Sequence, residues 1–276
     1  MAIDVTPLWD FSQPELSEQR FRDALQTASG DDALILQTQI ARSYGLRKDF
    51  ATARAVLRDI EPQTAQAGAE ARVRYFLELG RTYASAAHAP EQMTQQDRDL
   101  AHAAYVRALD EARAARLDNL AIDAIHMFAF IDTAPAEQLE WGRQALAVVE
   151  QSTQPAAKRW EASIRNNIGY ALHQLGRYEE ALQQFQLALE LRERGTDADA
   201  TRAAHWMIAW TLRAMGKPEK ALQIQLRLER EADAAGRPDR YVLEELEALY
   251  QTAGDTERAQ FYRQRREALS QKSPGG

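Results

Sequence analysis

The chain has 276 residues, of which 45% are hydrophobic, with a formal net charge of −7 and no cysteine. This composition supports a buried core, excludes disulfide bonds and thiolate metal sites, and argues against a nucleic-acid-binding protein, which normally carries a basic excess. No run approaches the roughly 20 apolar residues of a membrane span, and residues 1–11 lack the features of a signal peptide. We therefore expect a cytoplasmic protein with neither a nucleic-acid nor a membrane partner.

Along the chain, apolar residues recur at helical spacing in pairs of segments separated by turn signals. Residues 1–13 are expected to be extended and anchored by Trp9 and Phe11, and Pro14 is a typical first residue of a helix. Six helix pairs are then predicted at residues 34–67, 73–117, 118–151, 162–195, 202–236 and 240–270. We predict one domain over residues 1–270 and a disordered tail at residues 271–276.

The second pair contains an insertion between its helices, at residues 87–97. Thr94 followed by Asp97 is a typical helix start within it. We interpret the insertion as a tolerated loop, and contact with a ligand is the alternative. Shortening it is therefore expected to leave the fold intact.

The third pair, residues 118–151, is the least regular. One apolar stripe contains Leu120, Ala124 and Phe128, whereas Ile122 and Ile125 fit a register shifted by one or two residues. The sequence predicts a helix pair here but leaves open which face is buried.

The fourth pair is the most regular. Ile164, Ile168 and Leu172 form the apolar face of its first helix, and Gly176 lies where that helix has to end. Gly169 is a small residue on the apolar stripe, so we expect two helices to approach closely there. Leucine at this position is predicted to destabilise the protein by about 3 kcal/mol because the pair leaves no room for it.

Residues 169–189 follow the pattern G-Y-x-L-x-x-x-G-x-Y-x-E-A-L-x-x-F-x-x-A-L, which resembles a tetratricopeptide repeat of about 34 residues. The resemblance implies an all-α fold, a right-handed α-solenoid of about six helix pairs with an extra N-terminal helix. It also implies a binding scaffold in which the first helix of each pair lines a concave surface. A protein or peptide is the expected partner.

On the first helices, the positions that the core does not use are candidates for this surface. Those in the fourth and fifth pairs are polar or aromatic, and those in the early pairs are arginines. The candidate peptide- or protein-binding residues are Arg42, Arg74, Arg81, Asn166, Asn167, Tyr170, His173, Trp206, Trp210 and Arg213.

The tryptophans and arginines among these candidates also have structural interpretations that do not require a ligand. Trp206 and Trp210 lie one helical turn apart and are either binding anchors or ordinary packing between helices. The arginines either bind an acidic ligand or form ion pairs on a solvated surface. If the two tryptophans face a groove, replacing both with alanine is expected to spare the fold and weaken binding at least tenfold.

We find no sequence motif for catalysis. The patterns HExxH, GxSxG, GxxxxGK[ST] and GxGxxG are absent, and the five histidines lack the spacing of metal ligands. The lysine- and asparagine-based clamp of co-chaperones with similar repeats is not reproduced either, since the corresponding positions include Met207, Tyr241 and Glu245. We expect neither an enzyme nor a cofactor or metal.

The predicted function is therefore a protein- or peptide-binding scaffold whose groove, lined by arginines and by tryptophan and tyrosine rings, takes an acidic or aromatic-containing segment. One alternative is a self-assembling module in which Trp206 and Trp210 bury against a second copy as a homodimer. Another is a regulator that senses a signalling peptide. Arginine outnumbers lysine, as is typical of GC-rich bacterial genomes, so the source is predicted to be bacterial.

Overall fold

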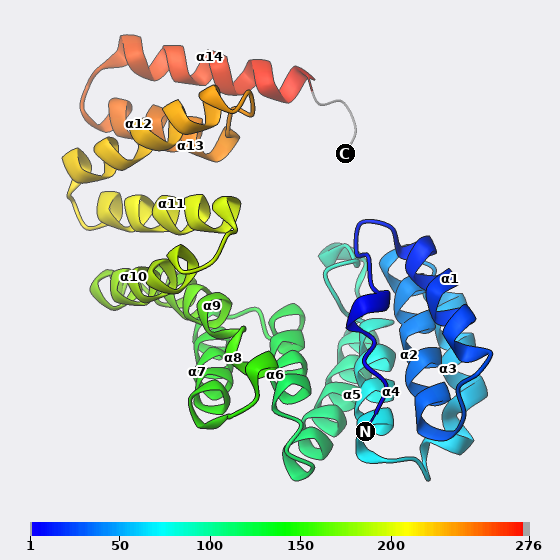
Figure 1. Cartoon of the computed structure of the whole chain (residues 1–276). Helices are drawn as coiled ribbons and strands as arrows, with labels where there is room; N and C mark the ends of the chain where they lie inside the picture. Colours follow the sequence, from blue (N-terminus) through cyan, green and yellow to red (C-terminus); the bar gives the residue numbers. More distant parts are fainter. Residues whose placement is uncertain (1, 273–276) are drawn as a thin grey trace. The chain divides into compact units, whose positions relative to one another are not determined.

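The computed structural model describes residues 2–272, which form fourteen α-helices and three short 3-10 helices without any strand (Figure 1). This confirms the predicted all-α fold. The chain divides into two compact units, residues 1–160 (unit 1) and residues 161–276 (unit 2). Residues 273–276 of the predicted tail lie outside the described residues, and one domain over residues 1–270 stays a prediction.

Unit 1 begins with the 3-10 helix η1 (Thr6–Leu8) and α1, followed by pairs of helices in which each packs on the next (Figure 1). The α-helices of unit 1 are α1 (Pro14–Leu25), α2 (Gly30–Leu46), α3 (Phe50–Thr64), α4 (Ala69–Arg81), α5 (Gln95–Ala114), α6 (Asp118–Met127), α7 (Pro135–Gln151) and α8 (Pro155–Lys158). Two further 3-10 helices, η2 (Pro90–Gln92) and η3 (Phe128–Phe130), lie between them.

The N-terminal segment is held against this unit by Trp9. Its ring lies edge-on to the buried Phe21, with centroids 4.9 Å apart, and its Nε1 donates a hydrogen bond to Oε1 of Gln39 at 3.0 Å. Phe11 stacks on the outer face of Trp9 and stays exposed. The indole of Trp9 thus anchors this segment both by apolar ring packing and by a hydrogen bond.

Helix α6 explains why the third pair showed two apolar registers. Leu120, Ala124 and Phe128 are buried, and so are Ile122 and Ile125. The helix packs against α5 on one side and α7 on the other, with further contacts to α4 and α8. A helix that is covered from several directions has apolar residues all round, so its periodicity is lost.

The insertion between α4 and α5 is only partly a free loop. The ring of His88 stacks on Phe50 with centroids 3.9 Å apart, and Thr94 and Asp97 form the predicted capping box of α5, which is confirmed. Residues 90–92 are exposed. The expectation that segment 87–97 can be shortened stays a prediction, and the contacts at its two ends lead us to restrict it to the middle of the segment.

Deleting residues 90–92 is expected to leave the melting temperature of the protein nearly unchanged, because the loss of a short exposed stretch changes loop entropy little. Removing residues 87–97 should instead destabilise the protein by more than about 1 kcal/mol, through loss of the His88 stack and of the α5 cap. Thermal denaturation of both variants checks this. Equal melting temperatures for the two deletions would show that His88 and Thr94 contribute nothing.

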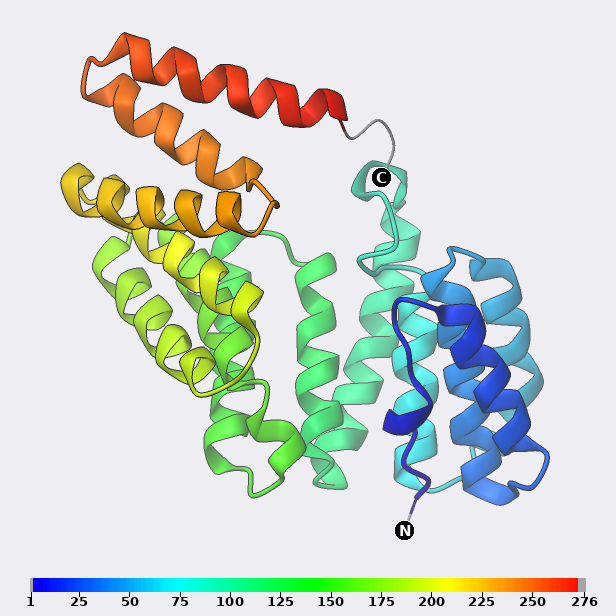
Figure 2. The same ribbon diagram turned by 45° about the horizontal axis from the view of Figure 1, so that its top comes forward.

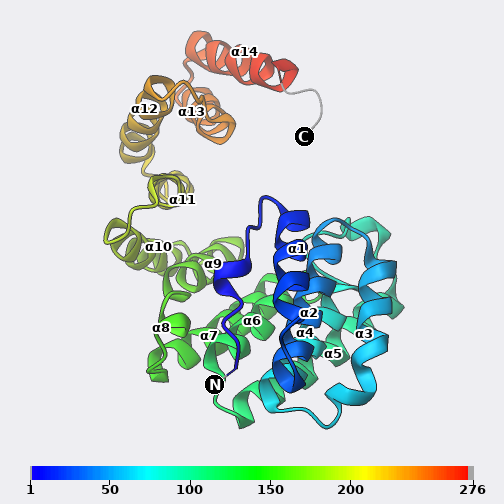
Figure 3. The ribbon, with the colours of Figure 1, turned by 45° about the vertical axis from the view of Figure 1, so that its right-hand side comes forward.

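Unit 2 consists of three helix pairs, and each helix packs on the next (Figure 2). Its helices are α9 (Glu161–Gln174), α10 (Tyr178–Glu193), α11 (Ala198–Ala214), α12 (Pro218–Ala234), α13 (Arg240–Thr252) and α14 (Thr256–Lys272). Figure 3 shows the same succession from α9 to α14 from another side. The first helices of the pairs are α9, α11 and α13.

Glycines fix the geometry of each pair in unit 2. Gly176, Gly216 and Gly254 follow first helices and have φ of +73°, +70° and +75°, a conformation that other residues adopt only with strain. Gly169 acts differently, since a Cβ built there would lie 2.7 Å from a ring carbon of Phe185. The missing side chain of Gly169 is therefore what lets α9 and α10 pack closely.

Candidate functional site

Five aromatic side chains form a continuous row across the first helices of unit 2. We call them the aromatic row: Tyr170 and His173 from α9, Trp206 and Trp210 from α11, and Tyr241 from α13. Tyr170 and His173 both stack on Trp210, with centroids 5.9 and 3.3 Å away, and Trp206 follows at 5.7 Å. Tyr241 meets Trp206 edge-on at 6.2 Å.

Helical spacing explains the row. Trp206 and Trp210 lie one turn apart and so point the same way, while Ile208 and Leu212 bury the opposite stripe of α11. The two ends of the row are open, since Tyr170 is 42% and Tyr241 63% exposed. The tryptophans are half-buried, so each both packs and presents ring surface.

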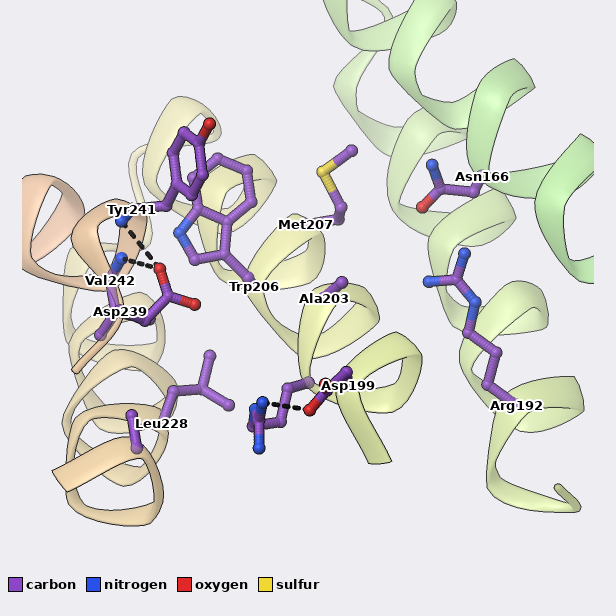
Figure 4. Close-up of a pocket in the computed structure, with 12 residues that line it drawn as sticks. Asn166, Arg192, Asp199, Ala203, Trp206, Met207, Leu228, Asp239, Tyr241 and Val242 are labelled. Carbon is purple, nitrogen blue, oxygen red and sulfur yellow. Dashed lines mark hydrogen bonds and ion pairs between the residues drawn. The ribbon is translucent and has the colours of Figure 1, made fainter. Parts of the chain in front are cut away.

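A pocket of about 490 Å³ opens beside Trp206; we call it the Trp206 pocket. Ala203 and Met207 lie between its two sides, with Trp206 and Tyr241 on one side and Asn166 and Arg192 on the other (Figure 4). Leu228 and Val242 are apolar and buried in its lining. Its size and its mainly apolar walls with a few polar groups are typical of a ligand site.

Arg192 is the unusual charge in this pocket. Its guanidinium donates a hydrogen bond from Nη1 to the carbonyl of Ala200 at 3.0 Å, and among the described residues no carboxylate lies within 4.0 Å of it. Burial lowers the pKa of Arg192, and the charge of Asp197 opposes that shift. A half-buried arginine without an ion pair is a favourable place for a ligand carboxylate or carbonyl.

Two of the arginines predicted from the sequence, Arg213 and Arg74, have ion-pair partners within the protein. Arg213 forms a bidentate ion pair with Glu245, with distances of 2.8 and 2.7 Å. In unit 1, Arg74 pairs with Glu70 at 2.8 Å. The interpretation of these arginines as ion-paired therefore fits the structure better than that of free ligand-binding charges.

The remaining predicted residues differ in position. Asn166 lines the Trp206 pocket, whereas Asn167 is exposed on α9 and is not part of the pocket lining. Arg42 and Arg81 lie in unit 1 and line a separate cavity. Sequence reasoning missed Arg192 because it lies on α10, a second helix, and only first helices were searched for the groove.

His173 lies in the interior of the aromatic row. Its ring is buried against Trp210, and its Nε2 has no hydrogen-bond partner among the described residues. Burial, with a smaller contribution from the charge of Arg213, lowers the pKa of His173 from 6.5 to about 4. The fold therefore requires a neutral imidazole.

Acidification is accordingly expected to destabilise unit 2 through His173. In the unfolded chain His173 binds a proton near pH 6.5, whereas in the folded protein it does so only near pH 4. The contribution of His173 to the free energy of unfolding is therefore constant above pH 6.5. Between pH 6.5 and pH 4 the unfolded chain binds more protons, so stability falls as the pH drops. We expect a loss of about 2 kcal/mol that His173→Phe abolishes, since phenylalanine keeps the stack and does not titrate. Denaturant titrations of both proteins at pH ~7 and ~5 measure the difference; equal pH dependence would contradict the assignment.

The described residues contain no group of three or more histidine, aspartate or glutamate side chains that fits a metal ion. None of their helices has the length and apolar character needed to cross a membrane. The arrangement in unit 2 thus combines aromatic rings, a pocket and the guanidinium of Arg192, which is suited to binding.

Comparisons with known proteins agree with this geometry. Residues 160–230 match the tetratricopeptide repeat family. No curated protein matches the sequence. Among solved structures, the apo form of RapI is similar with a TM-score of 0.73 and 15% identity, over 96% of this chain and 73% of RapI.

Two further structures share the fold. A signal transduction ATPase with a tetratricopeptide repeat sensor from Pyrococcus horikoshii has a TM-score of 0.70 and 12% identity, over 93% of this chain and 39% of that one. A Rap protein in complex with competence and sporulation factor has a TM-score of 0.56 and 14% identity, over 92% and 70%. At these identities the likeness concerns the fold, and it confirms the predicted α-solenoid. Residues 160–230 thus match the tetratricopeptide repeat family, and the described chain shares the α-solenoid fold of these structures.

Proposed function

We propose that the protein is a peptide-binding scaffold and that unit 2 contains its binding site. The Trp206 pocket is the observation that carries this proposal, because it joins ring surface, an apolar interior and the unpaired Arg192 in one place. Large flat rings that are already held in position bind with little loss of side-chain entropy.

The bound peptide is expected to place a large apolar side chain against Trp206 and Met207. A carboxylate next to that side chain would reach Arg192, with the amide of Asn166 beside it. An acidic preference would thus come from Arg192 and not from Arg213, whose charge Glu245 already balances. The rest of the aromatic row would contact neighbouring peptide residues.

The similar structures support a peptide ligand by analogy. One of them is a Rap protein with competence and sporulation factor bound, and another contains a repeat sensor. A regulator that senses a signalling peptide is the form of this proposal closest to them. The analogy extends to the fold and adds no residue to the site.

A random peptide display library tests the proposal, with selection on the full chain and on two variants of α11. Ala203→Trp places a ring in the pocket from an exposed position, and Ala214→Trp puts the same ring at an exposed position outside it. We expect peptides enriched on the wild type to pair a large apolar residue with a carboxylate, and to bind Ala214→Trp but not Ala203→Trp.

Two outcomes would reject the proposal. In one, no peptide is enriched over background on the wild-type protein. In the other, the selected peptides bind both variants equally well. Light scattering on the wild type addresses the self-assembly alternative, because a stable dimer that blocks peptide binding and dissociates in Ala203→Trp would mean that the pocket holds a second copy.

A further inference from the structure

Unit 1 contains a cavity of its own, with a volume of about 270 Å³. Its polar wall comes from the first helices α2, α4 and α6, which contribute Arg42, Glu78 with Arg81, and Asp123. Its lining also includes Trp160, whose Nε1 donates to Oδ1 of Asn119 at 2.9 Å and so holds the ring in place. The cavity therefore joins fixed charges with a fixed aromatic ring.

The four charged side chains alternate in sign along a chain of ion pairs. Arg81 donates to Oε1 of Glu78 at 2.6 Å and to Oδ1 of Asp123 at 2.5 Å, and Nη1 of Arg42 lies 3.6 Å from the same Glu78 oxygen. The proximity of Arg81 and Arg42 lowers the pKa of Asp123 against the effect of burial. The formal charges of the two arginines and the two carboxylates sum to zero.

Two members of this set, the buried Glu78 and the partly exposed Arg42, have hydrogen-bonding capacity that the protein does not use. Glu78 is 2% exposed, and its Oε2 is buried without any partner among the described residues. Across the same residues, the guanidinium of Arg42 donates no hydrogen bond; it faces Glu78 at ion-pair distance and lies over the rings of Trp9 and Phe11. A buried carboxylate oxygen without a partner is costly, and the cavity joins this carboxylate with a guanidinium whose donors are unused.

We propose that this cavity binds a small zwitterion with an apolar side chain, that is, a free amino acid of the leucine, methionine or phenylalanine kind. Its ammonium group would pair with the carboxylate of Glu78 and its carboxylate would accept from Arg42, so the formal charges of the cluster stay balanced. Its side chain would lie toward Trp160. A ligand with only one charge would unbalance the cluster, and a purely apolar one would leave Oε2 and Arg42 without partners.

Gly45 offers a way to close the cavity without harming the fold. It lines the cavity within α2, and a Cβ built there would meet nothing within 4 Å. Gly45→Leu is therefore expected to fill the space while also favouring the helix. Ala103→Leu, at an exposed position of α5, is the matched control.

The experiment is calorimetric titration of the full chain with leucine, methionine and phenylalanine, each compared with its amide and its N-acetyl derivative. We expect at least one free amino acid to bind, its two derivatives to bind at least tenfold more weakly, Gly45→Leu to abolish binding, and Ala103→Leu to retain it. Glu78→Gln should weaken binding of the free amino acid at least tenfold. The amide of the same amino acid should bind this variant no more tightly than it binds the wild type.

The proposal is overturned if none of the three amino acids binds, if a derivative binds as tightly as the free amino acid, or if Gly45→Leu binds as the wild type does. Each outcome is independent of the Trp206 pocket, because every residue varied here belongs to unit 1.

Discussion

Replacing Gly169 with leucine is expected to destabilise the protein by about 3 kcal/mol. A Cβ at this position would lie 2.7, 2.8 and 3.0 Å from three ring carbons of Phe185. Phe185 is fully buried and cannot swing away, so α9 and α10 would have to separate. Denaturant unfolding of the variant measures the loss, and an unchanged midpoint would show that the two helices do not pack as described.

Gly45→Leu is the control for this prediction, since it makes the same change in a helix where the new side chain meets open space. It is expected to leave stability unchanged or raised by a few tenths to about 1 kcal/mol. The contrast between the two variants separates loss of space from the general effect of removing a helical glycine.

Trp206→Ala is expected to weaken peptide binding at least tenfold, about 1.4 kcal/mol or more, with most of the effect on the dissociation rate. The indole forms a wall of the Trp206 pocket, and its removal takes away the ring surface that the peptide covers. Binding of a selected peptide, followed by fluorescence anisotropy, measures the change. Undiminished affinity in a folded variant would place the peptide elsewhere.

The expectation that both tryptophans can be replaced without loss of stability needs revision for Trp210. Its ring stacks on Tyr170 and on the buried His173, so Trp210→Ala should lower stability as well as affinity. Phe261→Ala is a useful control for both variants, because this ring is 52% exposed on α14 and is not part of the pocket lining. It should bind as the wild type does.

The fold was largely predictable because its signals are local. Helical periodicity, Gly176 and the capping box at Thr94 each act within one or two turns of chain and depend little on distant contacts. The buried face of α6 was not predictable, because it is decided by how many neighbours cover the helix.

The site was predictable only in part, because some of its features depend on local spacing and others on contacts between residues far apart in the sequence. The aromatic row follows from spacing on α9 and α11, so Tyr170, His173 and the two tryptophans could be proposed together. Whether an arginine is free depends on residues far along the chain, as with the ion pair of Arg213 and Glu245, 32 positions apart. The unpaired Arg192 could not be distinguished by sequence from the many paired arginines.

The central claim, that the Trp206 pocket binds a peptide, is tested most directly by the side-chain indole N–H signals in two-dimensional NMR spectra. The chain has five tryptophans, Trp9, Trp141, Trp160, Trp206 and Trp210, and only the last two belong to unit 2. Replacement of each by phenylalanine assigns its signal. On titration with a selected peptide, we expect the signals of Trp206 and Trp210 to shift and the other three to stay in place. Shifts confined to Trp9, Trp141 or Trp160 would contradict it.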